Sequence, residues 1–70
     1  MNNQELPKPG SYWKHFKGKE YRVIRVAKDC EDPSKLFVVY EGLHEETWIR
    51  PLEDFVGTHP NGQKRFYEIY

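Results

Sequence analysis

The chain has 70 residues and no net charge, because eleven Lys and Arg balance eleven Asp and Glu. This length allows one domain at most, and its core must be thin, since a domain this small buries only about 60% of the surface that its unfolded chain exposes. The single cysteine, Cys30, excludes an internal disulfide and favours a reducing, cytoplasmic setting. The polar first ten residues indicate no signal peptide, and no apolar stretch is long enough to span a membrane.

Residues 1–9 contain two prolines and are predicted to form a flexible leader before a domain over residues 10–70. Within the domain, runs of β-branched and aromatic residues alternate with Gly, Pro and Asn, which predicts short strands separated by turns. The expected strands are residues 11–17, 20–28, 36–43, 47–50 and 64–70.

The connections are predicted from residues that favour turns. Gly18 lies in a tight turn that requires an unusual φ, and Gly42 indicates a bulge or sharp bend inside its strand. Residues 51–55 are expected to form one helical turn, because the proline that begins them cannot pair in a sheet but is accepted at a helix start. The Asn-Gly pair that ends at Gly62 is typical of a tight turn with Gly62 at positive φ.

Five short strands with one helical turn before the last favour an all-β fold, a small five-stranded antiparallel SH3-like barrel. Because a short loop joins them, residues 20–28 and 36–43 are predicted to pair antiparallel. The expected core consists of apolar side chains on these elements: Phe16, Val23, Ile24, Val26, Phe37, Val39, Leu52 and Phe55.

Charge is distributed unevenly along the chain. Residues 1–28 carry seven basic and two acidic side chains, a net charge of +5, whereas residues 29–57 carry a net charge of −6. A basic first hairpin can lie against an acidic second one and form weak ion pairs. Alternatively, one basic face can attract an anion.

Three segments, "GSYWKHFKGKEYRVIRVAKD", "LFVVYEGL" and "WIRPLEDF", follow one another in the order of a known pattern. Over residues 10–70 the chain resembles the bacterial family called domain of unknown function 1653. The resemblance implies a small SH3-like domain and brings no assigned activity or ligand. The chain departs from the family pattern at Asp54, in the loop over residues 29–35 and in the short connection over residues 42–47. The matching positions are Gly10, Tyr12, His15, Phe16, Lys17, Gly18, Tyr21, Val23, Val38, Tyr40, Trp48, Ile49, Arg50, Pro51 and Phe55.

The spacing of reactive residue types indicates no catalytic or metal site. The three histidines and Cys30 are not paired at the short spacing of metal ligands. Cys30 has acidic neighbours and no nearby base in the sequence, which disfavours a nucleophilic thiolate. The adjacent acids at residues 45–46 and 53–54 fall in turns and are expected to be solvated. We therefore expect no enzyme activity, no metal and no cofactor, and His15 is expected to pack on a Tyr or Trp ring and to bond a backbone carbonyl.

Four Tyr and Trp residues fall on four different predicted strands. Such residues can form the core, or they can meet in a shallow groove that takes a peptide or a modified side chain. Since other apolar residues can supply the core, at least two of the four are expected to be partly exposed. The candidate ligand-binding groove comprises these four residues, Tyr12, Tyr21, Tyr40 and Trp48, together with His15 and Arg50.

Arg50 stands two residues after Trp48, so both side chains are expected on one face of a strand. Its guanidinium can be clamped by an internal carboxylate, from Glu41 or Glu53, in a purely structural role. Alternatively, the planar fork can recognise a carboxylate or phosphate of a ligand. The sequence leaves both interpretations open.

These patterns favour a non-enzymatic binding or interaction module that uses an aromatic-lined groove for a peptide or small ligand. One alternative is a nucleic-acid binder that uses the basic hairpin over residues 14–28, with Tyr12, Trp13 and Phe16 as stacking platforms. Another is a structural subunit of a larger assembly. A protein or peptide partner is favoured over nucleic acid, no membrane contact is expected, and the chain is expected to be a monomer or weak dimer.

Overall fold

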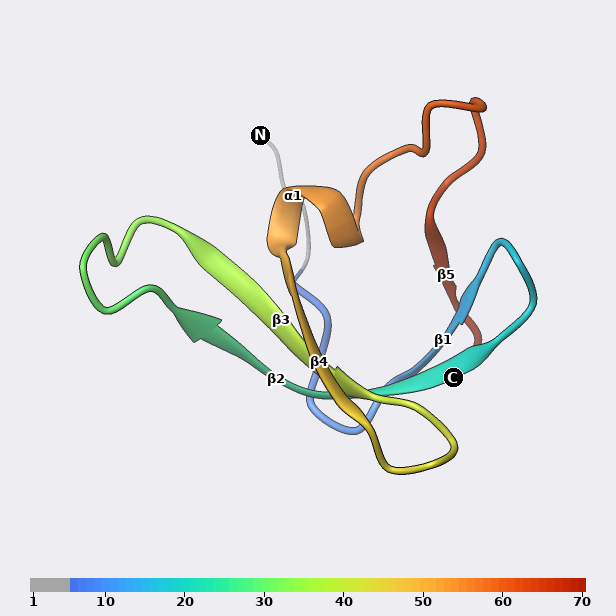
Figure 1. Cartoon of the computed structure of the whole chain (residues 1–70), viewed down its shortest axis with the longest axis horizontal. Coiled ribbons are helices and arrows are strands. Elements are labelled where there is room, and N and C mark those ends of the chain that lie inside the picture. Colours follow the sequence, from blue (N-terminus) through green and yellow to red (C-terminus); the bar gives the residue numbers. More distant parts are fainter. Residues whose placement is uncertain (1–5) are drawn as a thin grey trace.

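Five antiparallel strands and one helical turn form the part of the chain that the computed structural model describes, residues 6–70 (Figure 1). The strands belong to one sheet in the order β4-β3-β2-β1-β5. No helix in this range is long and apolar enough to cross a membrane. The elements are β1 (Tyr12–His15), β2 (Glu20–Lys28), β3 (Leu36–Glu41), β4 (Thr47–Pro51), α1 (Leu52–Phe55) and β5 (Phe66–Glu68).

The central pairing joins β2 to β3, as predicted, with partners from Arg22 opposite Glu41 to Lys28 opposite Leu36. The bend in the sheet does not lie at Gly42. It lies in β2, where the register shifts between Val23 and Arg25, because an extra residue there increases the local twist.

Strand ends account for most of the differences from the predicted boundaries. β3 ends at Glu41, and the Gly42 N–H then donates to the Glu46 carbonyl in the turn, at 3.0 Å. β5 is much shorter than the predicted strand over residues 64–70. The helical turn before it is confirmed, although Pro51 ends β4 and caps α1 instead of starting the helix.

Two glycines adopt the left-handed backbone that the sequence predicted for them. Gly18 has φ 107° in the β1–β2 turn, and Gly62 has φ 94° in a turn closed by its N–H on the His59 carbonyl at 2.8 Å. The predicted flexible leader begins with residues 1–5, which lie outside the described residues. Within the described part of the leader, Pro7 is buried.

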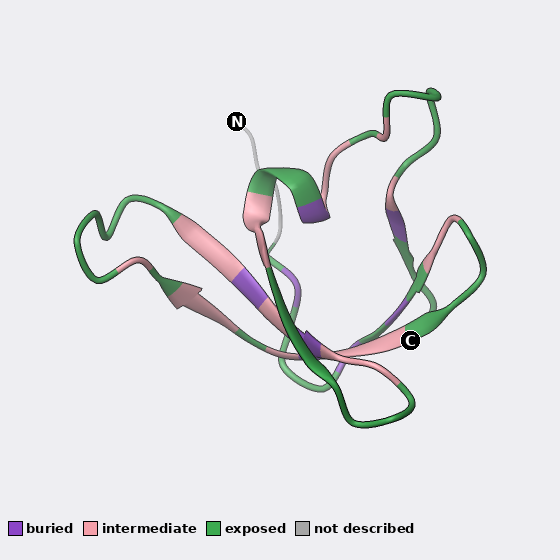
Figure 2. Cartoon of the chain, viewed as in Figure 1, coloured by how far each residue is buried: buried purple, intermediate pink, exposed green. Residues whose placement is uncertain are grey.

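The core lies on the inner, concave face of the bent sheet, under α1. Figure 2 shows buried segments on β3, α1 and β5. Of the eight predicted core residues only Val23 and Phe55 are fully buried. On β3, Phe37 and Val39 lie on the face opposite to the core, and their neighbours Val38 and Tyr40 are buried instead. The prediction therefore assigned the two faces of this strand the wrong way round. The buried residues of this core are Trp13, Val23, Val38, Tyr40, Phe55 and Phe66.

The sheet does not close on itself by hydrogen bonding. β4 and β5 stand at opposite ends of the strand order, and no pairing between them occurs among the described residues. The fold is therefore mostly β and antiparallel, as predicted, and closure into a barrel is not confirmed.

Candidate functional site

Register places the predicted site residues of β3 and β4 on the inner face. Trp48 lies directly opposite Tyr40, and Arg50 lies opposite Val38. Because alternate residues of a strand share a face, Trp48 and Arg50 lie on the same side of β4, as predicted. Toward the opposite edge of the sheet, His15 of β1 pairs with Phe66 of β5.

Tyr40, Arg50, His15 and Phe66 line a pocket of about 250 Å³ on this face. Four of the six predicted site residues meet there, and aromatic rings form much of its wall. No carboxylate lines this pocket, which we call the basic pocket. Its residues are His15, Lys17, Lys19, Tyr21, Tyr40, Arg50 and Phe66.

Arg50 is held without a carboxylate. Its Nε donates a hydrogen bond to the Tyr40 hydroxyl at 3.2 Å, and its guanidinium carbon lies 5.7 Å from the centroid of the Phe66 ring. The two terminal guanidinium nitrogens make no hydrogen bond within residues 6–70. The prediction that Glu41 or Glu53 clamps Arg50 was therefore wrong.

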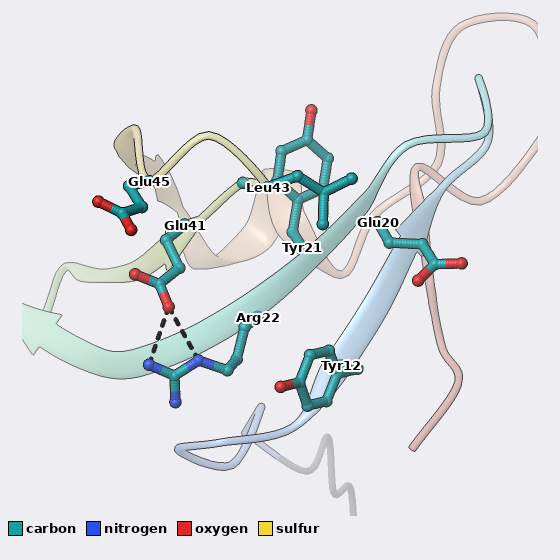
Figure 3. A pocket seen from close by; sticks show the side chains of 8 residues that line it. Tyr12, Glu20, Tyr21, Arg22, Glu41, Leu43 and Glu45 are labelled. Atoms are coloured by element: carbon teal, nitrogen blue, oxygen red, sulfur yellow. Dashed lines mark hydrogen bonds and ion pairs between the residues drawn. The ribbon is translucent and has the colours of Figure 1, made fainter.

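Glu41 instead pairs with Arg22 on the opposite, outer face of the sheet. The Arg22 Nε and Nη2 atoms lie 2.9 and 2.8 Å from one Glu41 carboxylate oxygen. This is the only ion pair between side chains in the described range, and dashed lines mark it in Figure 3. β3 directs Tyr40 inward, so the next residue, Glu41, must point outward.

His15 packs against phenylalanine instead of Tyr or Trp. Its ring lies edge-on to Phe66, with centroids 5.0 Å apart, and tilted over Phe16 at 4.5 Å. Its Nδ1 accepts a hydrogen bond from the Lys17 backbone N–H at 3.1 Å, so the predicted bond to a carbonyl was also wrong. A ring that accepts at Nδ1 carries its proton on Nε2 when neutral.

The electrostatic environment of His15 is positive. Burial lowers the pKa of His15 below its ordinary value, and the charge of Arg50 lowers it further, followed by Lys17, Arg65 and His59. All the charged neighbours that shift this pKa are cations or a second histidine. The pocket therefore has an excess of positive charge that no nearby side chain compensates.

Tyr21 stands at the boundary of the basic pocket. Its ring lies edge-on to Tyr40 and Phe66, with centroids 5.3 and 5.9 Å apart. Burial raises the pKa of Tyr21, as do Tyr40 and Glu46, while Arg50 opposes them. The hydroxyl therefore stays protonated near neutral pH and can donate a hydrogen bond.

Trp48 lies outside the basic pocket and lines a neighbouring one of about 200 Å³. Its side chain is 49% exposed, and that of Leu43 beside it is 83% exposed. The two pockets share Lys19 and Tyr21, so they adjoin. We call the second one the apolar pocket; its residues are Lys19, Glu20, Tyr21, Gly42, Leu43, His44, Glu46 and Trp48.

Tyr12 lies outside the basic pocket, and Tyr21 is the one other predicted site residue that lines a pocket with it. Tyr12 pairs with Arg22 across β1 and β2, and both residues line a third pocket with Glu41. Figure 3 shows Tyr12 and Arg22 on one side of β2 and the Tyr21 ring on the other. Tyr12 pairs with Arg22, whose side chain lies on the outer face, whereas Tyr40 lies on the inner face. The prediction of one groove that contains both Tyr12 and Tyr40 was therefore wrong.

The stacking platforms proposed for nucleic acid are not all available. Trp13 is buried in the core, edge-on to Phe55, and its Nε1 donates to the Ser11 hydroxyl at 2.8 Å. Phe16 is half-buried between the rings of His15 and His59. Of the three proposed residues only Tyr12 is exposed.

Sequence reasoning missed three residues of the basic pocket. Phe66 supplies an aromatic surface beneath Arg50, and Lys17 and Lys19 flank the turn glycine at the tip of the β1–β2 hairpin. The lysines were visible as a basic hairpin, but nothing local indicated that its tip lies near Arg50. Within residues 6–70, no group of three His, Cys, Asp or Glu side chains is arranged to hold a metal ion.

Comparison with protein families gives one result. The model of a family described as a protein of unknown function (DUF1653) matches residues 11–68. The chain belongs to this family, as its sequence pattern suggested. No match was found among curated proteins or solved structures.

Proposed function

We propose that this domain is a non-enzymatic binding module whose basic pocket takes an anionic group of a peptide or small ligand. The observation that carries the proposal is the state of Arg50. Tyr40 and Phe66 fix its guanidinium, and its terminal nitrogens are left without a partner in the described range. A planar fork that is pre-oriented in this way binds a carboxylate or phosphate with little loss of side-chain freedom.

The pocket lining supports binding over catalysis. It contains one histidine, two lysines, one arginine and three aromatic rings. Covalent catalysis usually needs a nucleophile that is hydrogen-bonded to a base, and no bond joins His15 to a lysine or tyrosine side chain in the described range. Such a set recognises charge and shape.

We also propose that the fold is SH3-like. Four strands follow one another as a meander, the fifth returns beside the first, and α1 lies between β4 and β5. The approach of Arg50 on β4 to Phe66 on β5 brings the two edges of the sheet close across the concave face. This approach of the two edges supports the proposal of a small, partly open barrel.

The proposed setting is the cytoplasm of a bacterium, with the chain acting as a monomer or weak dimer. The exposed free thiol of Cys30 supports a reducing compartment. A role as a structural subunit of an assembly would not require the open guanidinium of Arg50.

A titration with a capped glutamate tests the proposal. We expect its carboxylate to shift the amide resonances around His15 and Arg50 in a saturable manner at constant ionic strength. Arg50→Met should weaken this binding at least about tenfold, because the charged fork is lost. Arg25→Met is the matched control, since Arg25 is an exposed arginine of β2 outside the basic pocket.

A folded Arg50→Met variant that binds the capped glutamate as well as the wild type would refute the proposal. Well-dispersed amide spectra of both variants establish that they are folded. A single-stranded oligonucleotide measured in parallel tests the nucleic-acid alternative, for which affinity should decrease steeply with salt.

A further inference from the structure

The free edge of β4 brings both adjoining pockets within reach of one extended ligand. β4 is the edge strand of the sheet, with β3 on one side and no strand on the other in the described range (Figure 1). Its main chain therefore presents unpaired N–H and C=O groups along one side, which can template the addition of a further strand.

The spacing of the pockets matches the spacing of a strand. Arg50 lines the basic pocket and Trp48 lines the apolar pocket. These residues are two positions apart on the same face of β4, a separation of roughly 6.6–6.8 Å. An extended peptide paired with β4 repeats its own side chains on that face at the same interval, so alternate side chains of the peptide reach the two pockets.

The charge of the lining side chains changes sign from the basic pocket to the apolar pocket. Of these two pockets, Lys17 and Arg50 line the basic one and not the apolar one, whereas Glu20 and Glu46 line the apolar one and not the basic one. A polyanion that began on Arg50 would meet these two carboxylates with its next phosphate. The arrangement therefore favours a ligand with a single anionic group followed by an apolar one, and it disfavours nucleic acid.

The apolar pocket has side chains that gain from being covered. Leu43 is 83% exposed and Trp48 is 49% exposed, although the core of this short chain contains few large apolar side chains. Tryptophan is one of the residue types enriched at interface positions that dominate binding energy. An apolar side chain laid on Trp48 and Leu43 would remove both from water.

We infer that the ligand of this domain is an acidic peptide that adds as an extended strand to the free edge of β4. One acidic side chain, Asp, Glu or a phosphorylated residue, binds the guanidinium of Arg50. An apolar side chain two residues away packs on Trp48 and Leu43. The inference rests on the proposed function, because it requires the basic pocket to bind an anion, and it adds the peptide backbone and the second pocket.

The test uses short capped peptides with a glutamate and a leucine two positions apart, in both chain directions, titrated into the full chain. A phosphoserine version distinguishes the two sources of negative charge. A version with methylated backbone nitrogens removes the donors that pairing with β4 needs, and an alanine version removes the leucine. The capped glutamate alone is measured beside them.

We expect one chain direction to bind at least about tenfold more tightly than the capped glutamate, with shifts along Thr47–Pro51. Trp48→Thr should remove most of this gain, and Ile49→Thr should keep it. Ile49 is the matched control because it lies on the same strand, is 66% exposed and points to the opposite face. Backbone methylation should also abolish the gain.

Other outcomes overturn the inference. If the capped glutamate binds at Arg50 and the peptides bind no better, or if methylation and Trp48→Thr have no effect, the inference fails and the proposed function stands. If neither the capped glutamate nor any peptide perturbs the basic pocket, both fail. Tighter, strongly salt-dependent binding of a single-stranded oligonucleotide would replace the peptide with nucleic acid. Shifts along Thr47–Pro51 that appear without peptide at high chain concentration and disappear on dilution would instead indicate a second copy of the chain at this edge.

Discussion

Arg22 and Arg50 lie on opposite faces of the same sheet, and they differ in what neutralises them. On the outer face, two nitrogens of Arg22 contact one carboxylate oxygen of Glu41. On the inner face, Arg50 is held by the neutral hydroxyl of Tyr40 and by the ring of Phe66. The charge of Arg22 is neutralised by a carboxylate, whereas the guanidinium of Arg50 is held in place by neutral groups and keeps an uncompensated charge.

The comparison shows that charge in this chain differs from pocket to pocket more than from hairpin to hairpin. The outer pocket in Figure 3 contains Arg22 with three glutamates: Glu20, Glu41 and Glu45. The basic pocket contains three cations and no acid. A neutral total charge therefore conceals an outer pocket with an excess of acid and a basic pocket without any acid.

The largest effect is expected from removing the aromatic support of the inner face. Phe66→Ala deletes a fully buried ring that stacks on Phe55 with centroids 4.1 Å apart. Such a truncation costs about 3–5 kcal/mol, which is comparable to the whole stability expected of a core this small, about 3–5 kcal/mol. We expect the variant to be largely unfolded by circular dichroism.

Tyr67→Ala is the control for that substitution. Tyr67 is the next residue of β5 and its side chain is exposed on the other face, so its loss should cost less than about 1 kcal/mol. Equal destabilisation by the two substitutions would contradict the assignment of the faces.

A smaller effect is expected from exchanging each arginine for lysine. Arg50→Lys loses the Nε bond to Tyr40 and the planar contact with Phe66, which should cost about 1–2 kcal/mol in the free energy of unfolding. Arg22→Lys can still pair with Glu41 and should cost less than about 0.5 kcal/mol. Urea unfolding measures both costs. A larger loss of stability for Arg22→Lys than for Arg50→Lys would show that the planar guanidinium of Arg50 is not needed for its contacts with Tyr40 and Phe66.

The Arg22–Glu41 pair should contribute less still. The two side chains are 42% and 29% exposed, so solvent screens their attraction. A double-mutant cycle with Arg22→Ala and Glu41→Ala should give a coupling energy below about 1 kcal/mol that decreases with added salt. A large coupling energy that is insensitive to salt would contradict the expectation that this solvent-exposed ion pair contributes little to stability.

The smallest effect concerns pH. Burial and the neighbouring cations lower the pKa of His15 below its ordinary value of about 6.5. The unfolded chain therefore takes up this proton at a higher pH than the folded chain does, and stability decreases as the pH falls through about 6.5 until it passes the folded-state pKa. His15→Gln should remove this component of the pH dependence, as measured by urea unfolding between pH 5 and 8.

A bound anion should act in the opposite direction and raise the pKa of His15. The histidine ring resonances, followed against pH with and without the capped glutamate, report this shift. A His15 pKa at or above its ordinary value in the free protein would contradict the positive environment of the pocket.

Much of the fold could be predicted from the sequence, because the strands and turns depend on local preferences. The strand over residues 20–28 and the positive φ of Gly18 and Gly62 are examples. The sequence could not show which residues of β3 point to the core. Residues 36–40 are all apolar, so no alternation of apolar and polar side chains distinguishes the two faces of the strand.

That single ambiguity explains two errors. Phe37 and Val39 were expected in the core, and Glu41, which shares their face, was expected beside Arg50. In the structure all three lie on the outer face, where Glu41 meets Arg22. The approach of the β1–β2 turn and of Phe66 to Arg50 depends on the bend of the whole sheet, for which no local residue pattern is sufficient.

The most direct test of this account compares the two arginines in one experiment. The side-chain Nε–H resonances of Arg22 and Arg50 are followed by NMR while the capped glutamate is added at constant ionic strength. We predict a saturable shift for Arg50, whose terminal nitrogens have no partner in the described range, and none for Arg22, whose charge Glu41 already neutralises. An unchanged Arg50 resonance, or equal shifts of the two, would contradict the claim that Arg50 is held open for an anion.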